Sequence, residues 1–280
     1  MNSIFFIPYY FSIKTHYQSP KKIAVYFITY LIPELIILFL QRYYFIKPSL
    51  EFFIVYIIGM TSFVNLYEIG YIWNETETIK NEENPTKRLT DKNLFFYENR
   101  KILIYAERIL SSIILNIFLS FFITSYSLFA FICSQLLMLV TFFIYNNIRG
   151  NMTQLVYFFL CVLKYISITM CYFEYLTTSV VLATIFVFPF VRTFEYKAHY
   201  NLESNINLVF RKYIIKYNVN RITDFRFYCT GIIFMIFWLL YFIKITNLIP
   251  VVASGYIFVY RMILFIIVKA GVKIKGYISR

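Results

Sequence analysis

Apolar residues gather in eight long segments, separated by short loops and by two long polar stretches. A bilayer core of about 30 Å needs about 20 apolar residues to cross it as a helix. Each segment approaches or exceeds that length, so the pattern predicts an all-α, polytopic transmembrane helical bundle. The predicted spans are 22–41, 50–72, 102–122, 126–145, 152–170, 172–190, 226–243 and 248–268.

Basic residues are distributed unequally between the loops. With the N-terminus inside, the inner segments carry 21 Lys or Arg and the outer loops carry 3. Because cytoplasmic loops are enriched in Lys and Arg, the bias predicts that both termini are cytoplasmic. The long polar stretches, 73–101 and 191–226, then lie on the same side. We expect a cytoplasmic N-terminal segment, a single transmembrane domain and a basic cytoplasmic tail, at 1–21, 22–270 and 271–280.

The composition supports a membrane protein. Hydrophobic residues make up 60% of the 280 positions and charged residues 15%, and the mean hydropathy is +0.65. Such values are typical of integral membrane proteins. The net charge of +13 is explained by topology and by lipid headgroups, so it does not require a nucleic-acid partner. The 27 Tyr and 33 Phe can reflect AT-rich coding, and we do not interpret them as a binding signature.

Acidic residues cluster between Asn65 and Leu89, at the inner end of the second predicted span. If the helix continues past this end, Glu68, Glu75 and Glu82 recur every seven residues and share one face. Carboxylate and amide oxygens are the ligands that Mg²⁺ prefers, and Mg²⁺ is commonly shared with substrate phosphates. The alternative is a solvated charge run on a loop, balanced by the basic residues Lys80, Lys87 and Arg88.

Part of this cluster resembles the first signature of the UbiA-type intramembrane prenyltransferases, N-D-x-x-D-x-x-x-D. Asn74, Glu75 and Glu82 match its ends with Glu in place of Asp, and Thr78 stands at the middle acid. The following run 84–88, N-P-T-K-R, looks like the P-T-K-R of the branch that includes decaprenyl-phosphate phosphoribosyltransferase. Alignment by that run shifts the register and places three other residues at the acidic positions, namely Asn74, Glu77 and Asn81.

A second, weaker match follows the sixth predicted span. Arg192 and Glu195 have the R-x-x-E spacing found in the corresponding loop of the phosphoribosyltransferase branch. The stretch 205–218 reads as an amphipathic helix on the inner membrane surface, and it looks like the basic continuation of that loop. Both matches occur after the expected helices and on the side that the charge bias assigns to the cytoplasm.

The resemblance implies a transferase that uses a diphosphate donor and Mg²⁺. By this resemblance Glu75, Glu82 and Glu195 are catalytic, and the metal is held by Asn74, Glu75, Glu77 and Glu82. The donor is a prenyl diphosphate or phosphoribosyl diphosphate, and a polyprenyl phosphate is the acceptor in the second case. A role in cell-envelope or lipid assembly, in a bacterial inner membrane, is expected. Substrate-binding residues are expected at Asn65, Glu68, Asn74, Lys87, Arg88, Arg149 and Arg192.

Two other functions remain open, a transporter or flippase for a lipid-linked substrate and a family member that has lost catalysis. A transporter predicts charge along several spans and a route to both faces. The charges within or near the spans are Glu34, Lys164, Glu174 and Arg261, where isolation costs at least about 2.5 kcal/mol on insertion scales. We expect Lys164 and Glu174 to form an ion pair, and Arg108 to help to cap the start of a helix.

Overall fold

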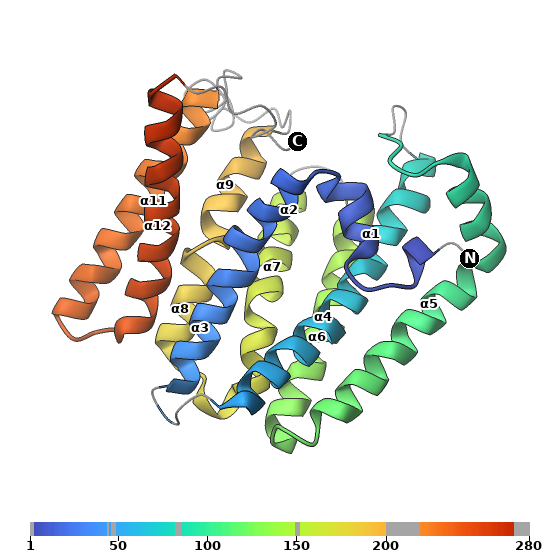
Figure 1. Ribbon diagram of the computed structural model, residues 1–280, viewed down its shortest axis with the longest axis horizontal. Coiled ribbons are helices and arrows are strands. Elements are labelled where there is room, and N and C mark those ends of the chain that lie inside the picture. Colours follow the sequence, from blue (N-terminus) through green and yellow to red (C-terminus); the bar gives the residue numbers. More distant parts are fainter. Residues whose placement is uncertain are drawn as a thin grey trace.

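The computed structural model describes residues 3–43, 45, 49–81, 86–148, 152–199 and 219–271, and the side chains of 195–199 and 219–221 are not described. Within these ranges the regular structure is entirely helical, without strands. The helices pack side by side into one bundle (Figure 1). The prediction of an all-helical membrane bundle is confirmed at this level.

Six helices in the described chain are long and apolar enough to cross a membrane. The first, Pro20–Tyr43, comprises α2 (Pro20–Tyr26), η3 (Phe27–Leu31) and α3 (Ile32–Tyr43). The others are α4 (Leu50–Thr76), continued by η4 (Thr78–Asn81), then α5 (Asp91–Leu119), α6 (Ser125–Asn147), α11 (Val219–Phe242) and α12 (Leu248–Lys269).

The predicted spans 152–170 and 172–190 take a less regular form. Helix α7 (Met152–Ile166) is followed by the 3-10 helix η5 (Ile168–Tyr175) at a bend of 63°. The return path consists of α8 (Thr178–Phe186) and α9 (Pro189–His199), which are short. A seventh span results if the bent pair is counted as one, so the structure does not confirm the predicted number of eight.

Local sequence explains where several helices begin. Threonine precedes α5, α6 and α8, and its hydroxyl accepts a hydrogen bond from the backbone two to three residues into the helix. Asn247 does the same for α12. These caps satisfy backbone N–H groups that have no partner inside the helix.

Helix α4 forms the centre of the bundle. It packs against α1, α5, α6 and η5, and its buried side chains include the largest set of polar residues in any one helix described. Gly70 lets α6 approach closely, because a Cβ atom at this position would lie 2.1 Å from the ring of Phe142. Polar groups are therefore carried into the interior by a helix that is covered on several sides.

Helix η3 is π-helical, so its wider turn leaves backbone carbonyls for other partners. Three tyrosine hydroxyls from different helices donate to these carbonyls. Tyr256 donates to Ile28 at 3.2 Å, Tyr165 to Thr29 at 2.8 Å and Tyr56 to Leu31 at 2.9 Å. The irregular segment is thus fixed by α4, α7 and α12.

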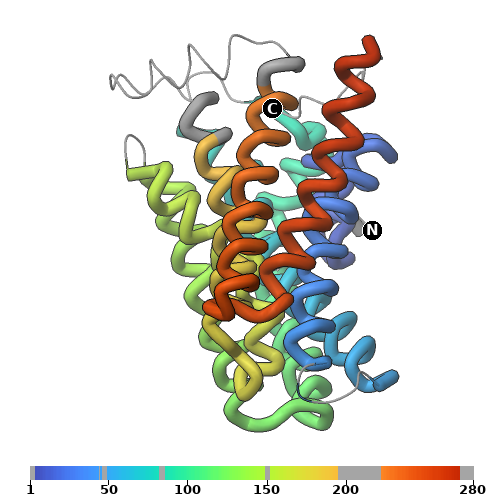
Figure 2. Tube along the Cα trace, turned by 90° about the vertical axis from the view of Figure 1, so that its left-hand side faces the viewer, coloured from blue at the N-terminus to red at the C-terminus, as the bar shows by residue number. Residues whose placement is uncertain are grey.

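The N-terminal elements α1 (Tyr10–Ser12) and η2 (Ile13–Tyr17) lie at one end of the bundle, with the link after α4 and the end of α9 (Figures 1 and 2). The turns between α5 and α6 and between α11 and α12 lie at the other end (Figure 1). We call the first the N-terminal end. The described parts of the segments that were predicted to be cytoplasmic are gathered there.

Candidate functional site

The predicted acidic face separates into three environments. Glu68 is fully buried, and its carboxylate accepts from Arg108 Nη1 at 2.9 Å and from the Ser12 hydroxyl at 2.6 Å. Asn65 accepts from the same guanidinium at 2.7 Å. Arg108 also donates to the backbone carbonyls of Phe5 and Ile7. This network holds the N-terminal segment against α4 and α5, and it leaves Glu68 no free direction toward a substrate.

We expected Arg108 to help to cap the start of a helix, and this prediction is wrong. Helix α5 begins at Asp91, so Arg108 lies well inside the helix and has no exposed surface.

Glu75 lies two turns further along α4, facing the interior. Its side chain is buried and forms an ion pair with Arg88. His16 Nε2 lies 3.7 Å from the same oxygen, and Asn74 Nδ2 is at 3.4 Å. Burial, together with the positive charges of Arg88, Lys164 and Lys22, lowers the pKa of His16 from 6.5 to about 3. The imidazole is neutral at pH 7, and Glu75 is balanced by Arg88.

Glu77 points toward α5. Its carboxylate accepts from the hydroxyl of Tyr97 at 2.8 Å and forms ion pairs with Lys101 and Lys80. Glu75 and Glu77 thus have separate partners on opposite sides of the end of α4. We expected Glu75 and Glu77 to bind the same metal ion, but in the structure their side chains point to different partners.

The predicted magnesium ligands are only partly described. No group of three His, Cys, Asp or Glu side chains suited to a metal occurs among the described residues. Glu82 and Arg149 lie outside the described residues, as does the stretch 205–218, and Glu195 lies in α9 without a described side chain. Glu75 forms an ion pair with Arg88, and Glu77 forms ion pairs with Lys80 and Lys101. We therefore derive no reaction step that involves a metal.

The basic residues predicted to bind substrate differ in how far they are buried. Lys87 is exposed, whereas Arg88 is half-buried and reaches inward to Glu75. Arg192, in α9, is also half-buried, and its Nε donates to the hydroxyl of Tyr157 at 3.3 Å. Arg88 and Arg192 come from opposite halves of the chain and both join the interior of the N-terminal end.

A connected series of aromatic and charged side chains continues from Glu75 toward the middle of the bundle. The ring of His16 lies 4.1 Å from that of Tyr71, and Tyr71 lies 5.0 Å from Tyr67. The ammonium of Lys164 lies over three rings, 4.0 Å from Tyr30, 5.0 Å from Tyr67 and 5.3 Å from Tyr26. We call this series, with Tyr17, Tyr157, Arg88 and Arg192, the tyrosine tract.

The sequence reasoning missed the tract because it set the aromatic residues aside. Tyr26 and Tyr30, and also Tyr67 and Tyr71, are four residues apart on their helices, which places each pair on one face. Lys164, a charged residue within a predicted span, was the other available signal, but we expected it to form an ion pair with Glu174. That pairing is wrong, because Glu174 is exposed and Lys164 faces the tyrosine rings.

The tract has the chemistry of an anion site beside apolar helices. Arg88, Lys164 and Arg192 carry three positive charges, and the buried acids near them are Glu75 and Glu34. Several tract residues, including Lys164, Tyr26, Tyr71 and Arg192, are half-buried rather than buried, so part of each side chain lies at the surface of the described chain. Basic side chains and tyrosine hydroxyls bind phosphate oxygens well.

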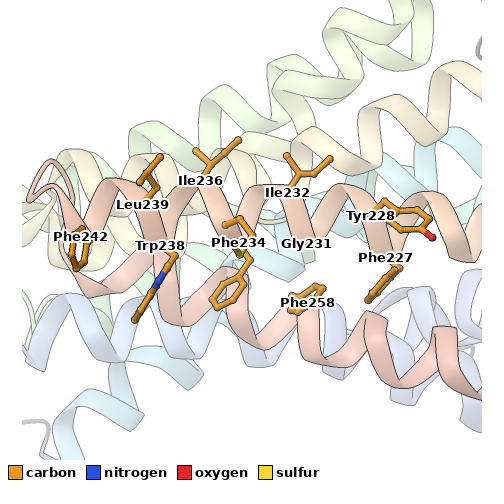
Figure 3. A pocket seen from close by; sticks show the side chains of 11 residues that line it. Phe227, Tyr228, Gly231, Ile232, Phe234, Ile236, Trp238, Leu239, Phe242 and Phe258 are labelled. Atoms are coloured by element: carbon orange, nitrogen blue, oxygen red, sulfur yellow. The ribbon is translucent and has the colours of Figure 1, made fainter.

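A hollow on the described surface lies elsewhere. It has a volume of about 840 Å³ and is formed on the outer face of the α11–α12 hairpin, chiefly by apolar side chains of α11 (Figure 3). Phe258 is the α12 residue that contributes to it. Its lining and position suit contact with lipid chains, and it contains none of the charged residues of the tract.

No protein-family model, curated protein or solved structure matches this chain. The functional conclusion therefore depends on the geometry of the tyrosine tract.

Proposed function

We propose that the protein is an integral membrane transferase that binds the diphosphate of its donor at the N-terminal end of the bundle. The observation that supports this proposal is the tyrosine tract, in which Arg88 and Arg192 stand at the end and Lys164 lies deeper. A diphosphate is the group that best matches such a set of cations beside apolar helices. The resemblance to UbiA-type prenyltransferases points to the same substrate class.

In this proposal the cations bind the diphosphate oxygens and stabilise the charge that grows on them as the bond to the donor carbon breaks. The carbon then bonds to a nucleophilic atom of the acceptor, and the acceptor loses a proton. Tyr67, Tyr71 and Tyr157 provide ring faces near the electron-poor carbon and exclude bulk water. A prenyl diphosphate and phosphoribosyl diphosphate both fit this scheme, with a polyprenyl lipid on the donor or the acceptor side.

A transfer assay tests the proposal. The purified protein in lipid nanodiscs is given radiolabelled farnesyl diphosphate or phosphoribosyl diphosphate with polyprenyl phosphate, with and without Mg²⁺, and labelled lipid is counted. Arg192→Gln should lower the rate about 10-fold or more, because a charge-assisted hydrogen bond contributes about 1.5–3 kcal/mol. Arg100→Gln is the matched control, since Arg100 is an exposed arginine on α5 outside the tract.

Absence of labelled lipid with both donors would contradict the proposal. Movement of labelled polyprenyl phosphate across sealed vesicles, without transfer, would instead favour the transporter. Equal rates for Arg192→Gln, Arg100→Gln and the unaltered protein would exclude the tract as the donor site.

A further inference from the structure

Helix α11 is the least covered of the six long spans in the described chain, and it carries the hollow shown in Figure 3. Only 17% of its most apolar part is buried in the bundle, against 22% to 61% in the other five. The hollow has a volume of about 840 Å³, within the range of about 300–1,000 Å³ that is typical of ligand sites. It is thus large enough to hold a ligand.

Three stacked phenyl rings form part of its lining. The ring of Phe258, on α12, lies 5.6 Å from that of Phe234 and 5.5 Å from that of Phe227, between centroids. Gly231 permits this arrangement, because a Cβ atom there would lie 3.0 Å from the ring of Phe258. Gly255 likewise makes room for Phe234, at 3.1 Å. This part of the lining is therefore held in place by contacts within the hairpin.

The rest of the lining consists mainly of large apolar side chains on the outward face of α11. They recur every three or four residues and are exposed, at Tyr228, Ile232, Met235, Ile236, Leu239 and Phe242. Helices that associate in membranes usually approach each other through small residues. Gly231 is the one small residue of the lining, and Phe258 already packs on it. A second helix could not approach closely here, whereas a flexible chain can lie between the side chains.

The hollow is longer than one leaflet of a bilayer is thick. Its lining extends along α11 from Phe227 to Phe242 (Figure 3), which corresponds to about 22 Å at 1.5 Å per residue. An ordinary tilt of about 20° reduces its extent across the membrane only to about 21 Å. Half of the hydrocarbon core measures about 15 Å, and the acyl chain of a phospholipid occupies about that depth. The hollow therefore suits a single chain that passes the middle of the bilayer.

We propose that this hollow binds the isoprenoid chain of a polyprenyl lipid. The inference rests on the proposed function, in which a polyprenyl lipid is a substrate, and it gives the chain of that lipid a site. The lining contains no charged side chain, so the hollow recognises the chain and not the phosphate. On the buried side of α11, Ile233 and Phe237 share a cluster with Val191 of α9. Helix α11 thus connects the chain site with the helix that carries Arg192.

Trp238 reports on the hollow because it belongs to the lining. The protein has two tryptophans, so Trp73→Phe leaves Trp238 as the only one. The full-length variant is placed in vesicles of phosphatidylcholine with brominated acyl chains, which quench tryptophan fluorescence on contact. Undecaprenyl phosphate carries no bromine, so its binding should restore the fluorescence at a low mole fraction. Farnesyl phosphate, with a much shorter chain, and dioleoyl phosphatidic acid, with acyl chains, should restore far less at the same mole fraction.

Filling the hollow should weaken the binding. In the Trp73→Phe background, Ile232→Phe should raise the mole fraction for half of the recovery about 5-fold or more, since overpacking a site costs at least that much in affinity. Ile266→Phe is the matched control, because Ile266 is an isoleucine of the same hairpin that is similarly exposed but lies outside the lining. Circular dichroism checks that each variant is folded, and Met235→Phe is a second filling variant if Ile232→Phe is not.

Equal recovery with undecaprenyl phosphate and with phosphatidic acid would assign the hollow to bulk lipid and overturn the proposal. Equal recovery with farnesyl phosphate would overturn it as well, because a long chain would then not be selected. Equal effects of Ile232→Phe and Ile266→Phe would place the chain outside the hollow. Absence of quenching by the brominated lipid would show that protein, such as a second copy of this chain, covers Trp238, and would also reject the lipid.

The transfer assay distinguishes this failure from that of the proposed function. Transfer without a selective recovery of Trp238 fluorescence rejects the chain site alone. Selective recovery in a protein that transfers nothing rejects the transferase alone, since binding of the chain does not require catalysis.

Discussion

Arg108 and Glu68 illustrate how one residue pair can organise a membrane bundle. Both side chains have no exposed surface, and the guanidinium also donates to Asn65 and to the carbonyls of Phe5 and Ile7. Each guanidinium nitrogen and each carboxylate oxygen has at least one hydrogen-bond partner, which is the condition under which an ion pair is tolerated in a low-dielectric interior. The pair therefore serves the packing of the N-terminal segment rather than the binding of phosphate.

Glu68→Gln should destabilise the folded protein by about 3–5 kcal/mol, because it leaves the charge of Arg108 buried without a counter-charge. The measurement is unfolding in mixed detergent micelles, followed by circular dichroism. Glu98→Gln is the control, since Glu98 pairs with Lys80 at an exposed position and such pairs contribute about 1 kcal/mol or less. Equal losses of stability in the two variants would contradict the structural role of the Glu68 pair.

At the scale of elements, the approach of α4 to α6 determines where the tract can form. Gly70 lies against the ring of Phe142, and its carbonyl accepts from Asn146 Nδ2 at 3.0 Å. The same ring packs on Tyr67 and Tyr71 at 4.9 and 5.4 Å between centroids. A residue larger than glycine would displace Phe142 and, through it, the two tyrosines.

Gly70→Ala should destabilise the protein by about 1–3 kcal/mol through overpacking. In the double variant Gly70→Ala/Phe142→Ala the added methyl group has room, so its cost should disappear relative to Phe142→Ala alone. Unfolding of the four proteins completes a double-mutant cycle. Additive losses would show that the contact between Gly70 and Phe142 does not limit the approach of the helices.

At the scale of the whole molecule, basic residues and irregular structure share one end of the bundle. We expect this N-terminal end to face the cytoplasm, because of the excess of Lys and Arg. In a variant without native cysteines, Lys87→Cys should resist a membrane-impermeant maleimide in intact cells, and Lys244→Cys should react. Both are exposed; Lys87 belongs to the link after α4 and Lys244 to the turn between α11 and α12, and these two segments lie at opposite ends of the bundle (Figure 1). Labelling of Lys87→Cys alone would reverse the orientation.

Hydropathy was sufficient to predict the long helices, because bilayer thickness sets their length and composition. It was insufficient between 152 and 199, where a bend of 63° and two short helices replace two predicted spans. That path depends on contacts between residues distant in sequence, such as the hydrogen bond that the backbone N–H of Phe173 donates to the hydroxyl oxygen of Ser127.

The candidate site was predictable only in part. The acidic residues at the end of α4 were found, but their directions were not, because Glu68, Glu75 and Glu77 face partners on other elements. Spacing along one helix gives the angle between two side chains about the helix axis. It does not say which other helix each side chain faces. Lys164 was noticed as a charge in a span, and only the fold brings three tyrosine rings around it.

The bonds from Arg108 to Phe5 and Ile7 join positions 103 and 101 residues apart. During synthesis the N-terminal segment is therefore made long before the helix that fixes it. Glu68 is also made first, 40 residues ahead of its counter-charge. Neither the N-terminal segment nor Glu68 can acquire this partner until α5 has been made, so the contacts that fix this end of the bundle require the chain to be complete as far as residue 108.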